Sequence, residues 1–287
     1  AKQYPAQRYY FGQVSHSAPL FLVLGNHDGE WGRRFDGTKD SMAGWSNLIR
    51  KEFFPNPVPN TFYTGNTRPV APLGLLEDYY AWVWGDALFV VLDPYWFTKG
   101  ADRGPGGFWD RTLGEEQYQW LKRTLETSRA AFKFVFIHNL VGGADQTMRG
   151  GAEAASFFEW GGHELDGRYT FPDNRPGWPA PIHQLLVDNH VAAVFHGHDH
   201  MFIRQERHGV VYQLLPQPGS SRYGSTRSPE GYSYTSGDVV AGAGYARVTV
   251  SPSETRLEFV QTRLPGDAAE GQENNTVAYS YVMKAQG

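Results

Sequence analysis

The stretch VAAVFHGHDH, at residues 191–200, joins a short apolar run to three histidines within five residues. The apolar half is rich in valine and alanine, and it predicts a buried strand. In extended backbone, residues two apart point the same way, so His198 and His200 are expected to present their imidazoles side by side. Gly197 allows the backbone to turn close to an ion. The stretch therefore predicts a strand with a metal-binding tip.

Three further apolar runs predict strands: PLFLVL at residues 19–24, ALFVVLD at 87–93 and FKFVFIH at 132–138. The first is followed at once by GNHD at residues 25–28, and the third ends in His138. Asp93 also ends a strand, but its position in this order favours a structural role. Ligands bind at the carboxyl ends of strands in layered α/β proteins, so the histidine-bearing tips are expected to converge on one site.

The remaining pattern predicts a layered α/β fold. Two segments have helical spacing of apolar residues, LGEEQYQWLKRTLETSR at 113–129 and PAPIHQLLVDNH at 179–190, and each precedes a predicted strand. From residue 210 to 283 the sequence alternates between apolar and polar residues, which indicates a mainly antiparallel, partly solvent-facing sheet. We find no linker or repeat, and we interpret residues 1–287 as a single domain.

Composition narrows the possible functions. The 287 residues include 26 lysines and arginines against 30 aspartates and glutamates, a net charge of −4, so no basic field attracts nucleic acid. There is no cysteine, which excludes disulfides, thiolate metal sites and cysteine nucleophiles. No apolar run reaches the roughly 18 residues that span a bilayer. Neither a serine-hydrolase elbow nor an HExxH zinc motif is present. Any metal must be held by nitrogen and oxygen.

In their order, GNHD, a strand-end histidine and GHDH, these motifs resemble the calcineurin-like metallophosphoesterases. They are most similar to the purple-acid-phosphatase-like branch, whose motifs are GNH[DE], H and GHxH. The similarity covers nearly the whole chain and implies a layered α/β/β/α sandwich. It also implies a hydrolase that cleaves phosphate mono- or diesters with a metal-activated water.

The resemblance implies a role for each motif residue. Asn26, His138 and His198 would bind the second metal ion, and His200 would bind the first. Imidazole and amide donors suit manganese, zinc or iron, and the complete enzyme would hold two such divalent or trivalent ions.

The same resemblance makes His27 the proton donor to the leaving group and Asp28 the residue that orients it. A histidine, with an ordinary pKa near 6.5, suits that task. The aromatic-rich, purple-acid-phosphatase-like character also favours an exported protein.

Two motifs of that family, D-x-H and GDxxD, are absent from the 287 residues. They would supply an aspartate and a histidine to the first ion and a bridging aspartate. We therefore expect only part of a dinuclear site, in a chain that represents a C-terminal portion of a longer domain without its N-terminal strands. The alternative is a non-catalytic domain that binds a single metal ion or a partner.

Weaker candidates for substrate binding are Arg149, Arg222 and Tyr223. Arg149 lies in a predicted long loop, residues 140–178, of the kind that often shapes a binding pocket. Arg222 and Tyr223 lie in GSSRYGS after the histidine-rich strand. A solvated surface charge and a polar turn are the respective alternatives.

Overall fold

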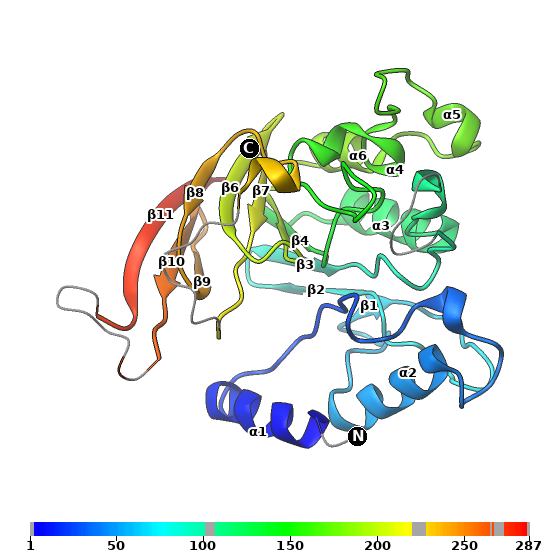
Figure 1. The fold of residues 1–287 in the computed structure, drawn as a ribbon, viewed down its shortest axis with the longest axis horizontal. Helices are drawn as coiled ribbons and strands as arrows, with labels where there is room; N and C mark the ends of the chain where they lie inside the picture. The colour runs from blue at the N-terminus through cyan, green and yellow to red at the C-terminus, as the bar shows by residue number, and fades with distance from the viewer. Residues whose placement is uncertain (1–2, 101–106, 220–227, 265, 267–272, 286–287) are drawn as a thin grey trace.

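A large mixed sheet of eight strands forms the centre of the molecule, in the order β1-β2-β3-β4-β5-β7-β6-β8 (Figure 1). The structure, a computed structural model, describes residues 3–100, 107–219, 228–264, 266 and 273–285. Strands β3, β4, β5 and β7 pair in parallel, and the other neighbours pair antiparallel. The strands are β1 Thr64–Gly65, β2 Tyr80–Trp84, β3 Ala87–Val91, β4 Phe132–Phe136, β5 Ala193–His196, β6 Phe202–Arg207, β7 Val210–Leu214 and β8 Asp238–Val240.

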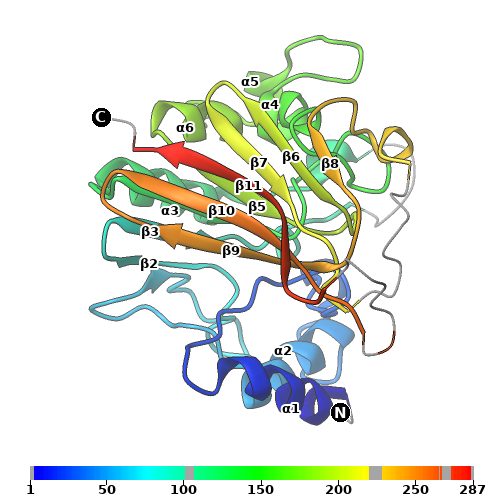
Figure 2. The same ribbon diagram turned by 90° about the vertical axis from the view of Figure 1, so that its left-hand side faces the viewer.

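A second sheet of three antiparallel strands covers one face of the large sheet (Figures 1 and 2). It consists of β9 Gly244–Val250, β10 Glu254–Gln261 and β11 Thr276–Lys284, in the order β11-β10-β9. The two sheets share an apolar core, in which Phe202 stacks on Phe259 with ring centroids 4.3 Å apart. Burial of such aromatic surfaces is the main force that holds the two layers together.

Helices cover the opposite face of the large sheet. α3 Glu115–Thr127 begins with two glutamates, which favour the positive end of the helix dipole, and buries Tyr118, Leu121 and Leu125 along one side. The other helices on this face are α4 Phe158–Gly161, α5 Phe171–Asn174 and α6 Ile182–Asp188. Helices α1 Gln3–Ser15 and α2 Met42–Phe53 lie together near β1 and β2 (Figure 1). Short 3₁₀ helices occur at Gly32–Arg34, Phe108–Asp110, Ala154–Ser156 and Glu230–Tyr232.

The architecture is of the predicted layered α/β class, and most of the predicted strands and helices occur at the expected residues. The part of the chain that the structure describes contains no helix with the length and apolarity to cross a membrane.

The predicted strand at residues 19–24 is wrong. The segment is extended but pairs with no strand, because side chains take up the polar groups of its backbone. The Asn56 amide binds both the Leu22 N–H (3.1 Å) and the Leu22 carbonyl (3.2 Å), and the Tyr80 hydroxyl donates to the same carbonyl (2.8 Å). Phe21 stacks on Trp82 at 4.1 Å. Side chains thus fix the segment against the sheet and lead the chain into residues 25–28.

Two other expectations need correction. The segment 140–178 is not one loop, since it contains α4, α5 and a 3₁₀ helix. The run at residues 210–216 does not belong to the solvent-facing antiparallel sheet. It forms β7, which is buried throughout and pairs in parallel with β5. A mainly apolar run such as VVYQLL suits a strand covered on both faces, and here the second sheet and the helices provide that cover.

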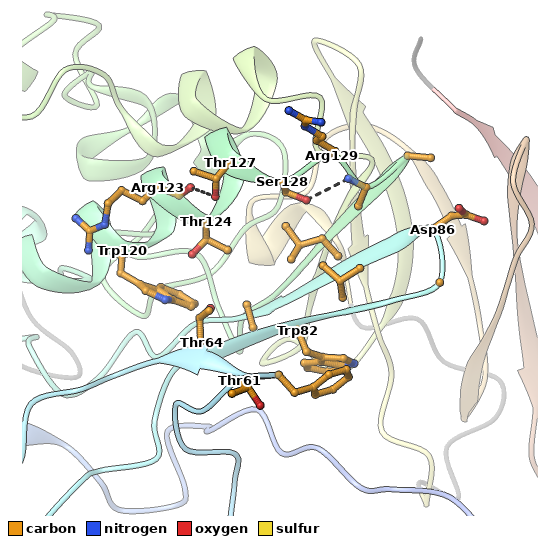
Figure 3. A pocket seen from close by; sticks show the side chains of 17 residues that line it. Thr61, Thr64, Trp82, Asp86, Trp120, Arg123, Thr124, Thr127, Ser128 and Arg129 are labelled. Atoms are coloured by element: carbon orange, nitrogen blue, oxygen red, sulfur yellow. Dashed lines mark hydrogen bonds between the residues drawn. The ribbon is translucent and has the colours of Figure 1, made fainter.

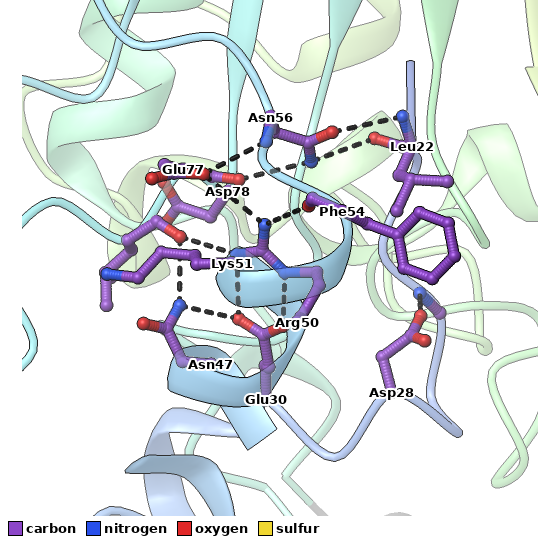
Figure 4. Close-up of polar contacts among 12 residues, drawn as sticks. Leu22, Asp28, Glu30, Asn47, Arg50, Lys51, Phe54, Asn56, Glu77 and Asp78 are labelled. Carbon is purple, nitrogen blue, oxygen red and sulfur yellow. Dashed lines mark hydrogen bonds and ion pairs between the residues drawn. The ribbon is translucent and has the colours of Figure 1, made fainter. Parts of the chain in front are cut away.

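A buried ion pair fixes the chain just beyond residues 25–28 (Figure 4). Arg50 of α2 contacts Glu30 through Nε at 2.5 Å and through Nη2 at 3.1 Å, and it also donates to the carbonyl of Leu76 at 2.6 Å. Asn47 adds a hydrogen bond to Glu30 at 2.8 Å. Burial opposes the charge on Arg50, but the facing Glu30 outweighs it and the pKa of Arg50 is raised. The pair joins α2 to the loop of residues 25–30.

We expect Arg50→Met to destabilise the protein by about 3–5 kcal/mol, because it leaves the buried Glu30 carboxylate without its partner. Urea unfolding followed by circular dichroism measures this loss. Arg168→Met is the matched control, since Arg168 and its partner Asp166 are both exposed and water screens such a pair. Equal losses in the two variants would contradict the structural role of Arg50.

Candidate metal centre

His138 and His198 lie together because they follow neighbouring parallel strands. β4 and β5 pair in register, and the ladder continues past both strands, with Ile137 N–H donating to the Phe195 carbonyl (3.0 Å) and Gly197 N–H to the His138 carbonyl (2.9 Å). The two tips therefore leave the sheet side by side. His138 Nε2 lies 3.3 Å from His198 Nδ1.

Asn26 reaches the same point from residues 25–28. A tight turn shapes this loop, in which Asp28 N–H donates to the Gly25 carbonyl (3.0 Å) and Gly25 N–H donates to Asp28 Oδ2 (2.6 Å). The indole N–H of Trp31 binds the Asn26 carbonyl at 3.0 Å. With its backbone held in this way, Asn26 places Oδ1 at 2.9 Å from His138 Nε2.

The expected extended geometry at residues 198–200 is not found. His198 and His200 have left-handed backbone, with φ of 74° and 59°, so their side chains are not displayed as on a strand. His198 faces His138, whereas His200 Nε2 lies 3.5 Å from the Gln217 amide nitrogen. His200 still lines the same cavity as His138 and His198. The third histidine of the run, His196, is the last residue of β5 and only 3% exposed.

The hydrogen bonds and burial favour neutral imidazoles. His198 Nε2 lies 3.0 Å from the Thr147 carbonyl, which can only accept, so Nε2 carries a proton. Burial lowers the pKa of His138 to about 3, and the nearby His198 and His200 act in the same direction. Burial also lowers the pKa of His196 to about 3. A neutral ring with its second nitrogen bound to a carbonyl is the usual state of a metal-binding histidine.

Three polar side-chain atoms lie close to one another and are candidate ligands for a shared metal ion. Ligands at about 2.1 Å from a tetrahedral ion lie about 3.4 Å from one another. The observed separations are 2.9 Å from Asn26 Oδ1 to His138 Nε2 and 3.3 Å from His138 Nε2 to His198 Nδ1. Among the residues that the structure describes, no three histidine, cysteine, aspartate or glutamate side chains form a metal-binding group. The convergent set therefore consists of two imidazoles and one amide oxygen, with His200 farther along the cavity wall.

A cavity of about 420 Å³ opens beside these donors. His27 is exposed and lines it, while Asp28 points back to the Gly25 backbone. Burial raises the pKa of Asp28, and the Gly25 hydrogen bond opposes that effect. The apolar part of the wall comes from Val23, Phe136, Phe195, Leu215, Pro216 and Pro218.

Arg149 is held near the histidines by other side chains. Its Nε lies 3.5 Å from Asp199 Oδ1, an ion-pair separation rather than a hydrogen bond, and its guanidinium sits 3.9 Å from the centre of the Tyr232 ring. Asp199 also accepts a hydrogen bond from the Tyr234 hydroxyl at 2.7 Å. Arg149 is thus fixed rather than freely solvated. The other two candidates, Arg222 and Tyr223, lie outside the described residues.

The sequence did not reveal the residues that support the donors from behind. Trp31, Tyr95 and Met148 form a small buried cluster, with Trp31 and Tyr95 rings 4.5 Å apart. Trp31 holds Asn26, and the Tyr95 hydroxyl donates to Asn139 Oδ1 at 2.6 Å, next to His138. The only sequence signal for these supporting residues was Tyr95, which lies two residues after Asp93 at the end of a predicted strand. Asp93 itself binds the backbone N–H of Tyr95 at 2.9 Å, in keeping with a structural role.

The fold, with two sheets, flanking helices and histidines at the ends of adjacent parallel strands, is of the calcineurin-like metallophosphoesterase type. Two solved structures carry this comparison. The structure of PhoD matches with a TM-score of 0.56 and 16% identity over 94% of this chain and 53% of that chain. The structure of the purple acid phosphatase PPD1 from yellow lupin (Lupinus luteus) seeds matches with a TM-score of 0.51 and 16% identity over 93% of this chain.

The resemblance drawn from the three motifs is thus confirmed as a resemblance of fold. The chain spans about half the length of PhoD and 41% of the purple acid phosphatase. No protein-family model matches the chain. No curated protein matches it in sequence.

Gly25 is the glycine that lets His138 occupy its position. A Cβ on Gly25 would lie 3.0 Å from His138 Nδ1, whereas a Cβ on Gly197 would meet the same atom at an ordinary 3.7 Å. We expect Gly25→Ala to displace the His138 ring and to destabilise the protein by about 1–3 kcal/mol. Gly197→Ala is the matched control and should cost less than about 1 kcal/mol in the same urea unfolding experiment. A larger loss for Gly197→Ala would contradict the packing seen here.

Asp28 should support the loop through its oxygen rather than its charge. Asp28→Ala removes the acceptor for the Gly25 N–H, and we expect a loss of about 1–3 kcal/mol of unfolding free energy. Asp28→Asn keeps an acceptor and relieves a buried charge, so it should retain most of the stability. Thermal and urea unfolding of the two variants measure the difference, and an asparagine variant as unstable as the alanine variant would show that charge dominates.

Proposed function

We propose that this chain belongs to a metal-dependent phosphoesterase that hydrolyses phosphate mono- or diesters. The observation that supports this proposal most directly is that three polar atoms from distant parts of the chain lie close together. His138 Nε2 lies 2.9 Å from Asn26 Oδ1 and 3.3 Å from His198 Nδ1. The likeness of fold to PhoD and a purple acid phosphatase also supports the proposal, because His138 and His198 follow strand ends, where layered α/β folds bind ligands.

In this proposal Asn26, His138 and His198 hold one ion and His200 contributes to a second, with manganese, zinc or iron as the candidates. Bound metal lowers the pKa of a coordinated water and offsets the charge of the phosphoryl group. The protein ligands named here are neutral, so they do not cancel the positive charge that attracts a phosphate. Four ligands do not complete two coordination shells, and we infer that these residues supply only part of a dinuclear site.

The exposed His27 is the proposed general acid. It lies on the wall of the cavity, from which an imidazolium proton can pass to the oxygen of the departing alcohol. Asp28 keeps the loop in shape through Gly25, so it positions His27 through the backbone rather than through the ring. Arg149, held by Asp199 and Tyr232, is a weaker candidate for contact with substrate.

A second candidate function is a non-catalytic domain that binds a single metal ion or a partner. The finding that favours it is the limited donor set, since only two imidazoles and one amide converge in the described part of the chain. Three ligands with solvent can hold one ion without a second metal.

The test combines turnover with metal binding. We expect the complete enzyme to hydrolyse p-nitrophenyl phosphate or bis-p-nitrophenyl phosphate in the presence of manganese, zinc or iron, and to lose this activity on chelation. His198→Ala and Asn26→Ala should each lower kcat/KM more than about 100-fold, because loss of a direct ligand exceeds the 10- to 100-fold effect of losing an outer partner. His16→Ala, at an exposed histidine that is not among the candidate ligands, is the control.

Metal titration by calorimetry separates the two candidates. Metal binding that His198→Ala abolishes, in a protein without turnover, would favour the non-catalytic domain. Turnover that survives both substitutions, or absence of both turnover and metal binding, would refute the roles assigned to these residues.

A further inference from the structure

The loop of residues 142–150 contacts the ring of His198. Its Thr147 carbonyl lies 3.0 Å from His198 Nε2. Three residues further on, the Gly150 N–H donates to Asp199 Oδ2 at 3.3 Å. The loop therefore binds the side chains of both residues that follow Gly197, and the orientation of the His198 ring depends on where the loop lies.

The same loop packs behind the other two candidate ligands. Its Met148 side chain is 4% exposed and belongs to the buried cluster with Trp31 and Tyr95. The indole of Trp31 binds the Asn26 carbonyl, and the hydroxyl of Tyr95 binds the residue next to His138. A displacement of residues 142–150 would thus disturb the surroundings of all three ligands.

The backbone of the loop has a conformation that outside contacts must maintain. Met148 has left-handed backbone, with φ of 62°. This region is unfavourable for a residue with a side chain, and it persists only where the surroundings impose it. The loop is also tightly closed, since a Cβ on Gly143 would lie 2.5 Å from Met148 Cα.

Arg111 supplies three of these outside contacts. It lies between the 3₁₀ helix Phe108–Asp110 and α3, and it is 1% exposed. The donors are both terminal nitrogens of its guanidinium group. They bind the carbonyls of Gly142 (Nη1, 3.0 Å), Asp145 (Nη1, 3.1 Å) and Gln146 (Nη2, 2.8 Å). The planar, forked guanidinium suits several acceptors at once, which the single ammonium of a lysine does not.

The buried charge makes this attachment firm. Burial lowers the pKa of Arg111, and the nearby Asp145 opposes that effect. A buried guanidinium that lost its acceptors would pay the full cost of desolvation, so the loop cannot move away from Arg111 without penalty. The Asp145 carboxylate in turn accepts the N–H groups of Thr147 (2.7 Å) and Arg149 (3.2 Å), which continues the support as far as the contact with His198.

We propose that Arg111 is a positioning residue of the candidate metal centre, which fixes the loop of residues 142–150 so that the Thr147 carbonyl orients the His198 ring toward a metal ion. The described wall of the metal-centre cavity does not include Arg111, so it acts through the loop and touches neither ion nor substrate. This inference rests on the proposed metal centre and adds the residue that keeps one of its ligands in place.

The first measurement needs neither metal nor turnover. Two-bond proton–nitrogen NMR spectra of the metal-free protein at neutral pH show which ring nitrogen of a histidine carries the proton, and His198→Ala assigns the His198 signals among the ten histidines. We expect the unmodified protein to carry this proton on Nε2. Arg111→Met should populate both tautomers, because the Thr147 carbonyl no longer holds the ring.

The second measurement is a calorimetric titration with Zn²⁺. Arg111→Met should raise the Kd by about 10- to 100-fold, the effect typical of losing a partner that orients a metal-binding histidine. Absence of binding by the unmodified protein would refute the metal centre itself, whereas the NMR spectra would still decide whether Arg111 orients His198.

A pair of variants at Asp145 tests the loop without removing a buried cation. Asp145→Ala removes the acceptor for the Thr147 and Arg149 N–H groups at a partly buried position, so the protein should fold. We expect it to change the His198 tautomer and to raise the Kd less than Arg111→Met does. Asp145→Asn keeps an acceptor without the charge, and it should retain the tautomer of the unmodified protein.

Lys133→Met is the matched control for loss of a buried cation. Lys133 is 8% exposed and, like Arg111, donates to a carbonyl, that of Leu125 at 2.8 Å. It lies near the start of β4, whereas His138 follows the end of that strand. Figure 3 shows the neighbourhood of that start, where Asp86 and Arg129 line a separate cavity of about 860 Å³. Lys133→Met should change neither the His198 tautomer nor the Kd.

Three results would overturn the proposal. The first is an unchanged His198 tautomer in Arg111→Met, or in Asp145→Ala should Arg111→Met not fold. The second is an unchanged Kd for Zn²⁺ in the same variant. The third is an equal change in Lys133→Met, which would show that any loss of a buried cation has this effect.

Discussion

The parallel pairing of β4 with β5 is the constraint on which the candidate metal centre depends. Two hydrogen bonds that extend the ladder beyond the strands bring the backbones of His138 and Gly197 into contact. Because the register of a parallel pair is fixed by its backbone bonds, the imidazoles of His138 and His198 must emerge at one edge. The apolar layers on either side of the sheet exclude water from those bonds and so hold the register.

Much of this arrangement could be predicted from the sequence, because it follows from local pattern. The runs ending at His138 and His196 are short, apolar and rich in β-formers, and both became strands of one sheet. Residues 19–24 have the same character and did not, since Asn56 and Tyr80, which come later in the chain, take their backbone groups. The pattern of apolar residues predicts which side chains of a segment are buried. The rest of the fold decides which groups form hydrogen bonds with its backbone.

The sequence predicted which residues form the candidate site better than it predicted their geometry. The motif order indicated Asn26, His138 and His198, but nothing in the sequence shows that His198 has left-handed backbone or that its Nε2 faces the Thr147 carbonyl. The residues that support the site could not be predicted from the sequence for the same reason. Arg50 and Glu30 are 20 positions apart, and their pairing depends on how α2 packs.

The left-handed backbone at His198 and His200 has an energetic consequence. Such a conformation costs a residue with a side chain on the order of 1 kcal/mol or more, a cost that glycine largely avoids. A change to glycine at either position would therefore relieve this cost, but it would also remove an imidazole from the wall of the cavity.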